Sequence, residues 1–449
     1  MSAKRPEGMR AFTTIWGGQI FSLIGSAMSG FALTIWAWEN QGTATALALV
    51  GFFNFAPMIL FSPIAGALVD RWNRKLVMAL SDLATGFTSM VVLALFLTGH
   101  LQLWHLFVTG AFAGLFQSFQ WPAYSAAISL MIPKEHYGRA SGMMSLAQWG
   151  SGIFAPVLAG MLIGKIGLGG ILAIDLATLA IALITLAVVK VPQPERDPQE
   201  KRENLIKDAG FGFRYIWRRP SLLWLQMVFF AGNLMATIAG TLVNPMVLAW
   251  TNNNATTLGT VQSAAAIGGV AGGLVITAWG GPKRRIHGVL IGWLLAGLLG
   301  YTVFGLAGGL TIWLVASFFD SFFGPVINAS NQAIWQSKVP PGLQGRVFSV
   351  RVMIAQITGP ISMLVAGPLA DQVFEPAMQN GGVLASTFGG IFGAHPGSGM
   401  ALMITISGLL MLVVGAGGYL MRPVRQVEDL IPDHDAPVPA AETDRTPAD

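Results

Sequence analysis

The chain contains no cysteine, and charged residues are scarce in it. Asp, Glu, Lys and Arg together make up 10% of its 449 residues, whereas a typical soluble domain has about 25%. The absence of cysteine excludes disulfide bonds, thiol catalysis and zinc sites built on cysteine. The scarcity of charge excludes a water-soluble domain of this length. We therefore expect lipid to surround most of the chain.

Hydrophobic residues, which make up 53% of the chain, gather in long apolar runs. Each run has about 20 residues or more, which is enough to cross a bilayer as a helix. The 55 glycines suit helices that pack closely inside a membrane. The sequence predicts an all-α integral membrane protein with twelve transmembrane helices near 12–38, 46–69, 76–97, 102–130, 141–164, 169–190, 221–250, 256–279, 287–307, 309–336, 347–371 and 399–421.

Basic residues lie on one side of the predicted membrane. The N-terminus, the loops after the even-numbered helices and the C-terminal segment hold every Lys and Arg except Lys165. By the positive-inside rule, both termini are expected in the cytoplasm, in a multi-pass protein of the plasma (inner) membrane. The first run is expected to stay as a helix and not to be cleaved as a signal. The same asymmetry explains the isoelectric point near 9.6, so no nucleic-acid partner is predicted.

The two halves of the chain are related. A constant shift of the numbering aligns Gln19 with Gln226, and it aligns Pro133 and Gly138-Arg139 with Pro340 and Gly345-Arg346. Such a repeat predicts two pseudo-symmetric six-helix bundles with a site between them at mid-membrane. The predicted domains are a first bundle at 1–190, a cytoplasmic linker with an interfacial helix at 191–220, a second bundle at 221–422 and a disordered tail at 423–449.

A charged turn joins the second and third predicted helices. It contains Gly66, Asp70, Arg71, Arg74 and Lys75 in the pattern Gly-x-x-x-Asp-Arg-x-x-Arg-Lys. This pattern resembles the signature loop between helices 2 and 3 of the major facilitator superfamily of transporters. The resemblance implies a conformational latch that docks against helix 11 in one state and releases it in the other. The alternative is that the cations only fix the topology.

The turn's counterpart in the second half runs from Gly273 to Arg285. It keeps the glycine and the cations but has no aspartate. Any latch is therefore expected to be asymmetric.

Small residues surround a proline in the fifth predicted helix, at Gly152, Pro156 and Gly160. They resemble the antiporter motif of drug-exporting members, although Ala155 and Ala159 replace two of its glycines. The alternative is a simple packing face. The passages 339–351 and 366–371 are similar to the macrolide-efflux branch of drug:proton antiporters, a branch that includes siderophore exporters.

Carboxylates inside the membrane are the candidates for proton coupling or substrate binding, since each charged Asp costs about 2.5–3.5 kcal/mol at a helix centre. The candidates are Asp320, Glu39 and Asp175. Asp320 is alternatively a protonated or hydrogen-bonded packing residue, and Glu39 an interfacial one. Asp82 is expected to support the charged turn, and Asp371 to lie at the outer surface. Helix 4 lacks the Arg that many proton-coupled exporters carry there, so coupling would depend on carboxylates alone.

Polar and aromatic side chains inside the helices are candidates for the cavity lining. The alternatives are contacts between helices or with lipid. The candidates are Gln19, Trp36, Asn54, Gln117, Gln120, Trp149, Gln226 and Asn233. The six histidines show no metal-ligand spacing, and no HExxH, Walker A or Gly-x-Ser-x-Gly motif occurs. We predict no cofactor, no metal and no enzymatic activity.

These observations favour a secondary active transporter that works as a monomer by alternating access. Its expected activity is proton-coupled efflux of a lipophilic or amphipathic small molecule, such as a drug, a macrolide or a siderophore-like compound. The glycine-rich outer segment 373–398 is expected to cover the exit. One alternative is an uncoupled facilitator or lipid translocator of the same fold. The other is a membrane sensor that does not transport.

Overall fold

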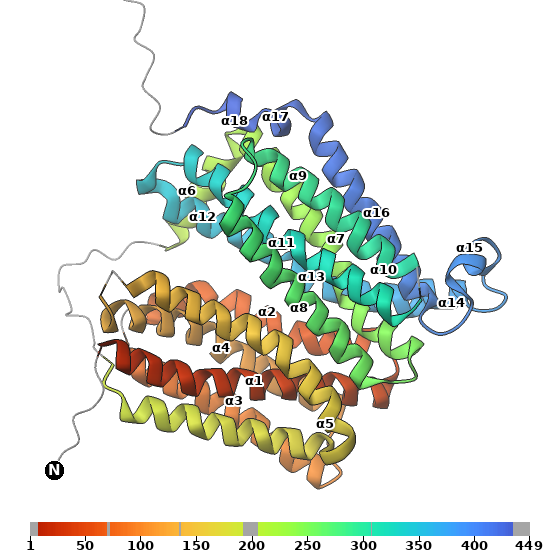
Figure 1. The fold of residues 1–449 in the computed structure, drawn as a ribbon, viewed down its shortest axis with the longest axis horizontal. Coiled ribbons are helices and arrows are strands. Elements are labelled where there is room, and N and C mark those ends of the chain that lie inside the picture. Colours follow the sequence, from red (N-terminus) through yellow and green to blue (C-terminus); the bar gives the residue numbers. More distant parts are fainter. Residues whose placement is uncertain (1–7, 70–71, 134–135, 192–204, 307, 434–449) are drawn as a thin grey trace, which may run out of the picture.

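The computed structural model describes residues 8–69, 72–133, 136–191, 205–306 and 308–433, which form helices and no strand. The helices form two bundles that lie side by side (Figure 1). The first bundle contains α1 (Gly8–Gln41), α2 (Ala44–Val69), α3 (Arg74–Leu97), α4 (Leu103–Met131) and α5 (Tyr137–Val188). The long elements of the second are α7 (Pro220–Trp250), α8 (Ala255–Trp279), α9 (Arg285–Leu295), α11 (Leu310–Lys338), α12 (Pro341–Gln356), α13 (Thr358–Leu369) and α16 (Ser398–Leu420).

The element α5 contains two of the expected helices. Gly167 interrupts it with φ 65° and ψ −179°, a backbone conformation that is essentially restricted to glycine. The chain therefore turns back at Gly167, between the runs expected at 141–164 and 169–190. Ten segments of the described chain are long and apolar enough to cross a membrane, and one of them, Gly142–Val188, contains this turn. The total of twelve crossings stays a prediction.

Short elements interrupt or connect the long helices of the second bundle. The described residues form two π-helices, η2 (Ala296–Thr302) after α9 and η3 (Ala370–Phe374) after α13. The segment expected to be a glycine-rich loop contains two short helices. The remaining short elements are α6 (Leu205–Trp217), α10 (Val303–Leu306), α14 (Glu375–Met378), α15 (Ala385–Phe392), α17 (Arg422–Arg425) and α18 (Val427–Leu430).

The linker helix α6 packs against α12. At Gly212, a Cβ atom would lie 2.4 Å from the Arg346 carbonyl oxygen, so only glycine allows this approach. Trp217 is exposed, as an interfacial residue should be. Tyr215 of the same helix, which an interfacial helix would also place at the headgroups, is buried instead, and the Arg219 guanidinium lies 3.6 Å from the centre of its ring.

Side-chain caps begin two helices at opposite ends of the molecule. The Asn73 side chain accepts a hydrogen bond from Leu76 N at the start of α3 (3.1 Å), and the Asn254 side chain accepts one from Thr257 N at the start of α8 (2.9 Å). Each cap satisfies a backbone N–H that the first turn leaves without a partner. We call the end of the bundles with the α2–α3 turn the basic face, and the end with the α1–α2 turn the opposite face.

The two bundles are joined near the opposite face. The Asp371 carboxylate, in η3, accepts hydrogen bonds from Ala44 N (3.0 Å), Thr45 N (2.7 Å) and Thr45 Oγ1 (2.5 Å) at the start of α2. Trp38 Nε1 donates to Asn253 Oδ1 (2.7 Å). In the described chain, the other side-chain hydrogen bonds between the bundles, Thr256 Oγ1 to the Gly160 carbonyl and Ser263 Oγ to the Ile153 carbonyl, join α8 to α5.

The apolar core is shared by the two bundles toward one face and belongs to the first bundle alone toward the other. One large cluster of buried residues contains side chains of both bundles, among them Ile35 and Leu47 of the first and Leu258 and Ala366 of the second. A separate, smaller cluster includes Phe12, Val77 and Ala140, and all its members belong to the first bundle. The smaller cluster lies toward the basic face, where α1 and α3 begin. The bundles therefore share a core toward the opposite face.

Candidate functional site

A cavity of about 780 Å³ lies between the bundles. Helices α1 to α4 form its wall on one side. On the other side α7 contributes Thr237, Thr241 and Asn244, and Tyr301 and Met363 complete the wall. The cavity reaches the middle of the helices, where a site between two repeats is expected.

Asp175 of α5 lies at the wall of this cavity and is 4% exposed. Its carboxylate accepts hydrogen bonds from Ser26 Oγ of α1 (2.9 Å) and Ser89 Oγ of α3 (2.7 Å). These neutral donors hold the carboxylate in place, and it forms no ion pair with any described residue. Asp175 is therefore a buried acid that faces open space and has no cationic partner there.

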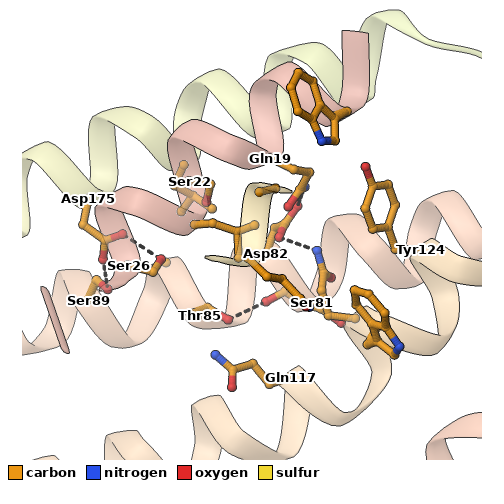
Figure 2. Close-up of a pocket in the computed structure, with 18 of the residues that line it drawn as sticks. Gln19, Ser22, Ser26, Ser81, Asp82, Thr85, Ser89, Gln117, Tyr124 and Asp175 are labelled. Atoms are coloured by element: carbon orange, nitrogen blue, oxygen red, sulfur yellow. Dashed lines mark hydrogen bonds between the residues drawn. The ribbon is translucent and has the colours of Figure 1, made fainter. Parts of the chain in front are cut away.

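A second pocket, of about 330 Å³, lies within the first bundle (Figure 2). It adjoins the central cavity, because Asp175, Ser26, Ser89, Thr85 and Gln117 line both. Figure 2 shows Asp175 with Ser26 and Ser89 on one side of the view. Asp175 therefore lies at the boundary between the two pockets.

Asp82 of α3 is the second acid of this pocket, and 7% of it is exposed. Its carboxylate accepts a hydrogen bond from Gln19 Nε2 of α1 (3.0 Å) and one from Gln120 Nε2 of α4 (2.8 Å). Asp82 was expected to support the charged turn, but these bonds tie it to two neighbouring helices within the bundle. Amide donors stabilise an ionised carboxylate without neutralising its charge.

Asp320 lines a third pocket, of about 140 Å³, in the second bundle. Tyr301 hydrogen-bonds the Asp320 carboxylate and also lines the central cavity. Tyr301 belongs to the π-helix η2, and a Cβ at the preceding Gly300 would lie 2.9 Å from Asp320 Cα. Single turns of π-helix often occur at functional sites. Here the π-helix and its glycine bring Tyr301 against the acid.

Four of the expected lining residues line these pockets, namely Gln19, Asn54, Gln117 and Gln120. The other four line none of the three. Trp149 packs against Gly269 of α8. Gln226 is fully buried and donates to the Arg351 carbonyl (3.3 Å).

Asn233 donates to the Phe229 carbonyl of its own helix (2.8 Å). Trp36 is partly buried and packs against the large core cluster. Glu39, expected among the coupling carboxylates, is exposed near the end of α1 and lines none of the three pockets.

The charged turn is only partly described. Asp70 and Arg71 lie outside the described residues, and Gly66 lies in α2. Arg74 begins α3 and is buried. Lys75 Nζ donates to the carbonyl oxygens of Ala187 (2.9 Å) and Val189 (2.6 Å), so it ties the turn to the end of α5.

The antiporter-like motif of α5 faces α8. At Gly160 a Cβ would lie 2.8 Å from the Ala255 carbonyl oxygen, and Gly152 lies against Ala266. The Pro156 carbonyl faces Gly259, where a Cβ would lie 2.4 Å from it. The motif therefore forms one of the contacts between the bundles, because its small residues let α5 and α8 approach closely.

Several polar lining residues were not among the candidates. Ser22, Ser26, Thr85, Ser89 and Tyr124 line the pocket of the first bundle. Their spacing in the sequence could have identified most of them. Gln19, Ser22 and Ser26 recur at i, i+3 and i+7, as do Asp82, Thr85 and Ser89, and this spacing places each set on one helix face.

The sequence matches a family profile over residues 15–363, and that family is the Major Facilitator Superfamily. Macrolide efflux protein A of Streptococcus pyogenes is 27% identical over 364 residues, which cover 81% of this chain and 90% of that protein. Multidrug efflux pump Tap of Mycolicibacterium fortuitum is 26% identical over 364 residues, covering 78% and 87%. The expected resemblance to the macrolide-efflux branch is therefore confirmed.

Solved structures with the same fold include a bacterial homologue of the human lysosomal transporter Spinster, in an inward-facing, unoccupied conformation. It has a TM-score of 0.66 and 16% identity, and the match covers 93% of this chain and 98% of that one. A bacterial homologue of the iron transporter ferroportin, in an inward-facing state, has a TM-score of 0.65 and 14% identity, with 91% and 98% covered. Together the profile match, the relatives and the fold show that this chain is a membrane transport protein of the Major Facilitator Superfamily.

Proposed function

We propose that this chain exports a lipophilic or amphipathic small molecule from the cytoplasm, driven by protons. The observation that carries the proposal is the central cavity between the bundles, with the buried carboxylate of Asp175 in its wall. The efflux function of the two named relatives supports the direction of transport. The positive-inside rule, applied to the basic loops, supports a cytoplasmic position for the basic face.

Alternating access is the second part of the proposal. In this conformation the contacts between the bundles gather toward the opposite face, where α2 meets η3 and α5 meets α8. They support an inward-facing state in which substrate enters the cavity from the cytoplasm. Release outside requires that these contacts break while new ones form at the basic face. The charged turn at the end of α2 is the proposed latch of that outward-facing state.

Proton coupling is the third part, and we assign it to Asp175 and Asp320. Asp175 contacts the cavity directly, and Asp320 is linked to it through Tyr301. A membrane potential supplies about 2.3 kcal/mol per charge per 100 mV, enough for more than tenfold accumulation per proton. Both acids can exchange a proton for substrate as the cavity alternates between the two sides.

The test is uptake of a lipophilic cationic dye and a macrolide into proteoliposomes with an imposed pH gradient. Asp175→Asn and Asp320→Asn should each lose gradient-driven uptake. Glu39→Gln is the matched control and should keep it, because Glu39 lines none of the three pockets. Wild-type uptake that ignores the gradient would instead indicate an uncoupled facilitator. Gradient-driven uptake by the double variant Asp175→Asn/Asp320→Asn would contradict coupling through these acids.

A further inference from the structure

We propose that the pocket of the first bundle binds the protonated amine of the substrate, with Asp82 as its counter-ion. This inference rests on the proposed function and narrows it, because it names the substrate class as lipophilic amines. The site is distinct from the central cavity and adjoins it at Asp175, which lines both.

The charge balance of the pocket points to a cation. Asp82 and Asp175 line it, and none of the described residues that line it is Lys, Arg or His. Neither acid forms an ion pair with any residue of the described chain. Buried charges in proteins are normally paired or bound to a cation. Since the described part of the chain supplies no such partner here, a cationic ligand would supply it.

The hydrogen-bonding groups of the pocket point to an N–H donor. Three atoms that are buried there have no hydrogen-bond partner among the described residues: Ser81 Oγ, Gln120 Oε1 and Tyr124 Oη. Ser81 is 2% exposed and adjoins Asp82 in sequence. A hydroxyl or amide oxygen accepts hydrogen bonds, and buried polar atoms normally have partners. A protonated amine would donate to Asp82 and to one of these oxygens.

The remaining walls suit the apolar part of such a ligand. Trp16, Trp121 and Tyr124 line the pocket, and Figure 2 shows Asp82 and Gln19 between Asp175 and Tyr124 in this view. The Trp16 ring is fixed, because its Nε1 donates to the Met143 carbonyl (2.8 Å). Aromatic faces attract ammonium groups and pack against apolar substituents. A pocket of about 330 Å³ holds the amine and part of its apolar body, and the rest can extend into the central cavity.

The experiment is equilibrium binding to the full chain purified in detergent, without a gradient. The probes are imipramine, which carries a dimethylammonium group, its N-methyl quaternary derivative, and iminodibenzyl, the same ring system without the amine chain. Imipramine should bind at least about tenfold more tightly than iminodibenzyl, a ratio typical of one charge-assisted contact. The quaternary derivative should fall between them, since it keeps the charge but has no N–H. Equal wild-type affinities for imipramine and iminodibenzyl would overturn the proposal.

Variants then locate the site. Asp82→Asn, which preserves shape, should bring the imipramine-to-iminodibenzyl ratio close to one, whereas Glu39→Gln should leave the ratio unchanged. Tyr124→Phe should weaken imipramine severalfold without affecting iminodibenzyl, and it provides the test if Asp82→Asn does not fold. An unchanged ratio in folded Asp82→Asn would place the cation elsewhere.

The binding and transport experiments distinguish a failure of this proposal from a failure of the proposed export. Amine-selective binding without gradient-driven uptake would leave this site standing and refute the proposed export. Gradient-driven uptake without amine-selective binding would support the proposed export and refute the amine site.

Discussion

Replacing Asp371 with asparagine should weaken the contacts that hold the two bundles together at the opposite face. The Asp371 carboxylate accepts three hydrogen bonds from the first turn of α2, two of them from backbone N–H groups. It binds across the two bundles, so these bonds exist only while the opposite face is closed. A negative charge at a helix N-terminus also interacts favourably with the helix dipole. Asp371 should therefore act on the equilibrium between the two conformations and only weakly on folding.

The magnitude follows from what asparagine keeps. Its single carbonyl oxygen can accept one or two of the three bonds, but the negative charge is lost. Hydrogen bonds to charged groups contribute about 1.5–3 kcal/mol, and the charge–dipole term contributes up to about 2 kcal/mol when partly buried. Because asparagine recovers part of the total, we expect a shift of about 2 kcal/mol, or about thirtyfold. An outward-facing population of about 1% would rise to about a quarter.

Spin-label distances measure this shift directly, and the absence of cysteine means that the introduced ones are the sole labelling sites. Labels at Lys165 and Ile312 report on the opposite face, and labels at Lys190 and Lys283 on the basic face. Asp371→Asn should lengthen the first distance and shorten the second in a growing fraction of molecules.

The matched control is Glu375→Gln. Glu375 also caps a helix, since its carboxylate accepts from Gly397 N (3.0 Å) and Met400 N (2.8 Å), but both partners belong to its own bundle. Its loss should leave both distance distributions unchanged. Wild-type distributions in Asp371→Asn, or equal shifts in both variants, would refute the reasoning.

Two further predictions follow from single contacts. In Gly259→Ala, the new Cβ would lie 2.4 Å from the Pro156 carbonyl oxygen. Overpacking of this kind costs about 1–3 kcal/mol. The distance between the labels at Lys165 and Ile312 should therefore increase. Gly273→Ala on the same helix is the control: its new Cβ would have open space around it, so the distance between these labels should not change. The hydrogen bond from Lys338 Nζ (2.8 Å) lowers the pKa of Asp433. The ionised Asp433 carboxylate therefore stabilises the folded chain above its unfolded pKa of about 3.9. This stabilisation is lost as the pH falls through the lower pKa that Asp433 has in the folded chain. Hydrogen exchange of residues 427–433 should lose protection in that acidic range, and Asp433→Asn should remove this pH dependence.

The helices and the family were predictable from the sequence, because both depend on local properties. Runs of apolar residues long enough to cross lipid specify membrane helices regardless of what those helices contact. The spacing of Gln19, Ser22 and Ser26 places polar groups on one helix face in the same way. The turn at Gly167, where φ is 65°, likewise lies between the two runs expected at 141–164 and 169–190.

The sites required the tertiary structure. Gln19 and Gln226 occupy equivalent positions in the two halves, yet Gln19 binds Asp82 in a pocket and Gln226 is fully buried away from the three pockets. The repeat fixes where each residue lies along its helix, but the neighbouring helices decide what its side chain meets. Asp82 likewise lies near the charged turn in sequence but binds Gln19 and Gln120 on other helices.

Asp371 depends most on tertiary structure, because its partners Ala44 and Thr45 lie more than 300 residues earlier in the chain. Its sequence context indicates only an acid at the end of an apolar run. The packing of the two bundles brings that acid to the first turn of α2, whose backbone N–H groups have no partners within their own helix. The sequence by itself determined which segments enter the membrane, because transfer into lipid depends on each segment alone. The packing of the bundles determined which polar groups are paired and which face open space, because that depends on residues far apart in the chain.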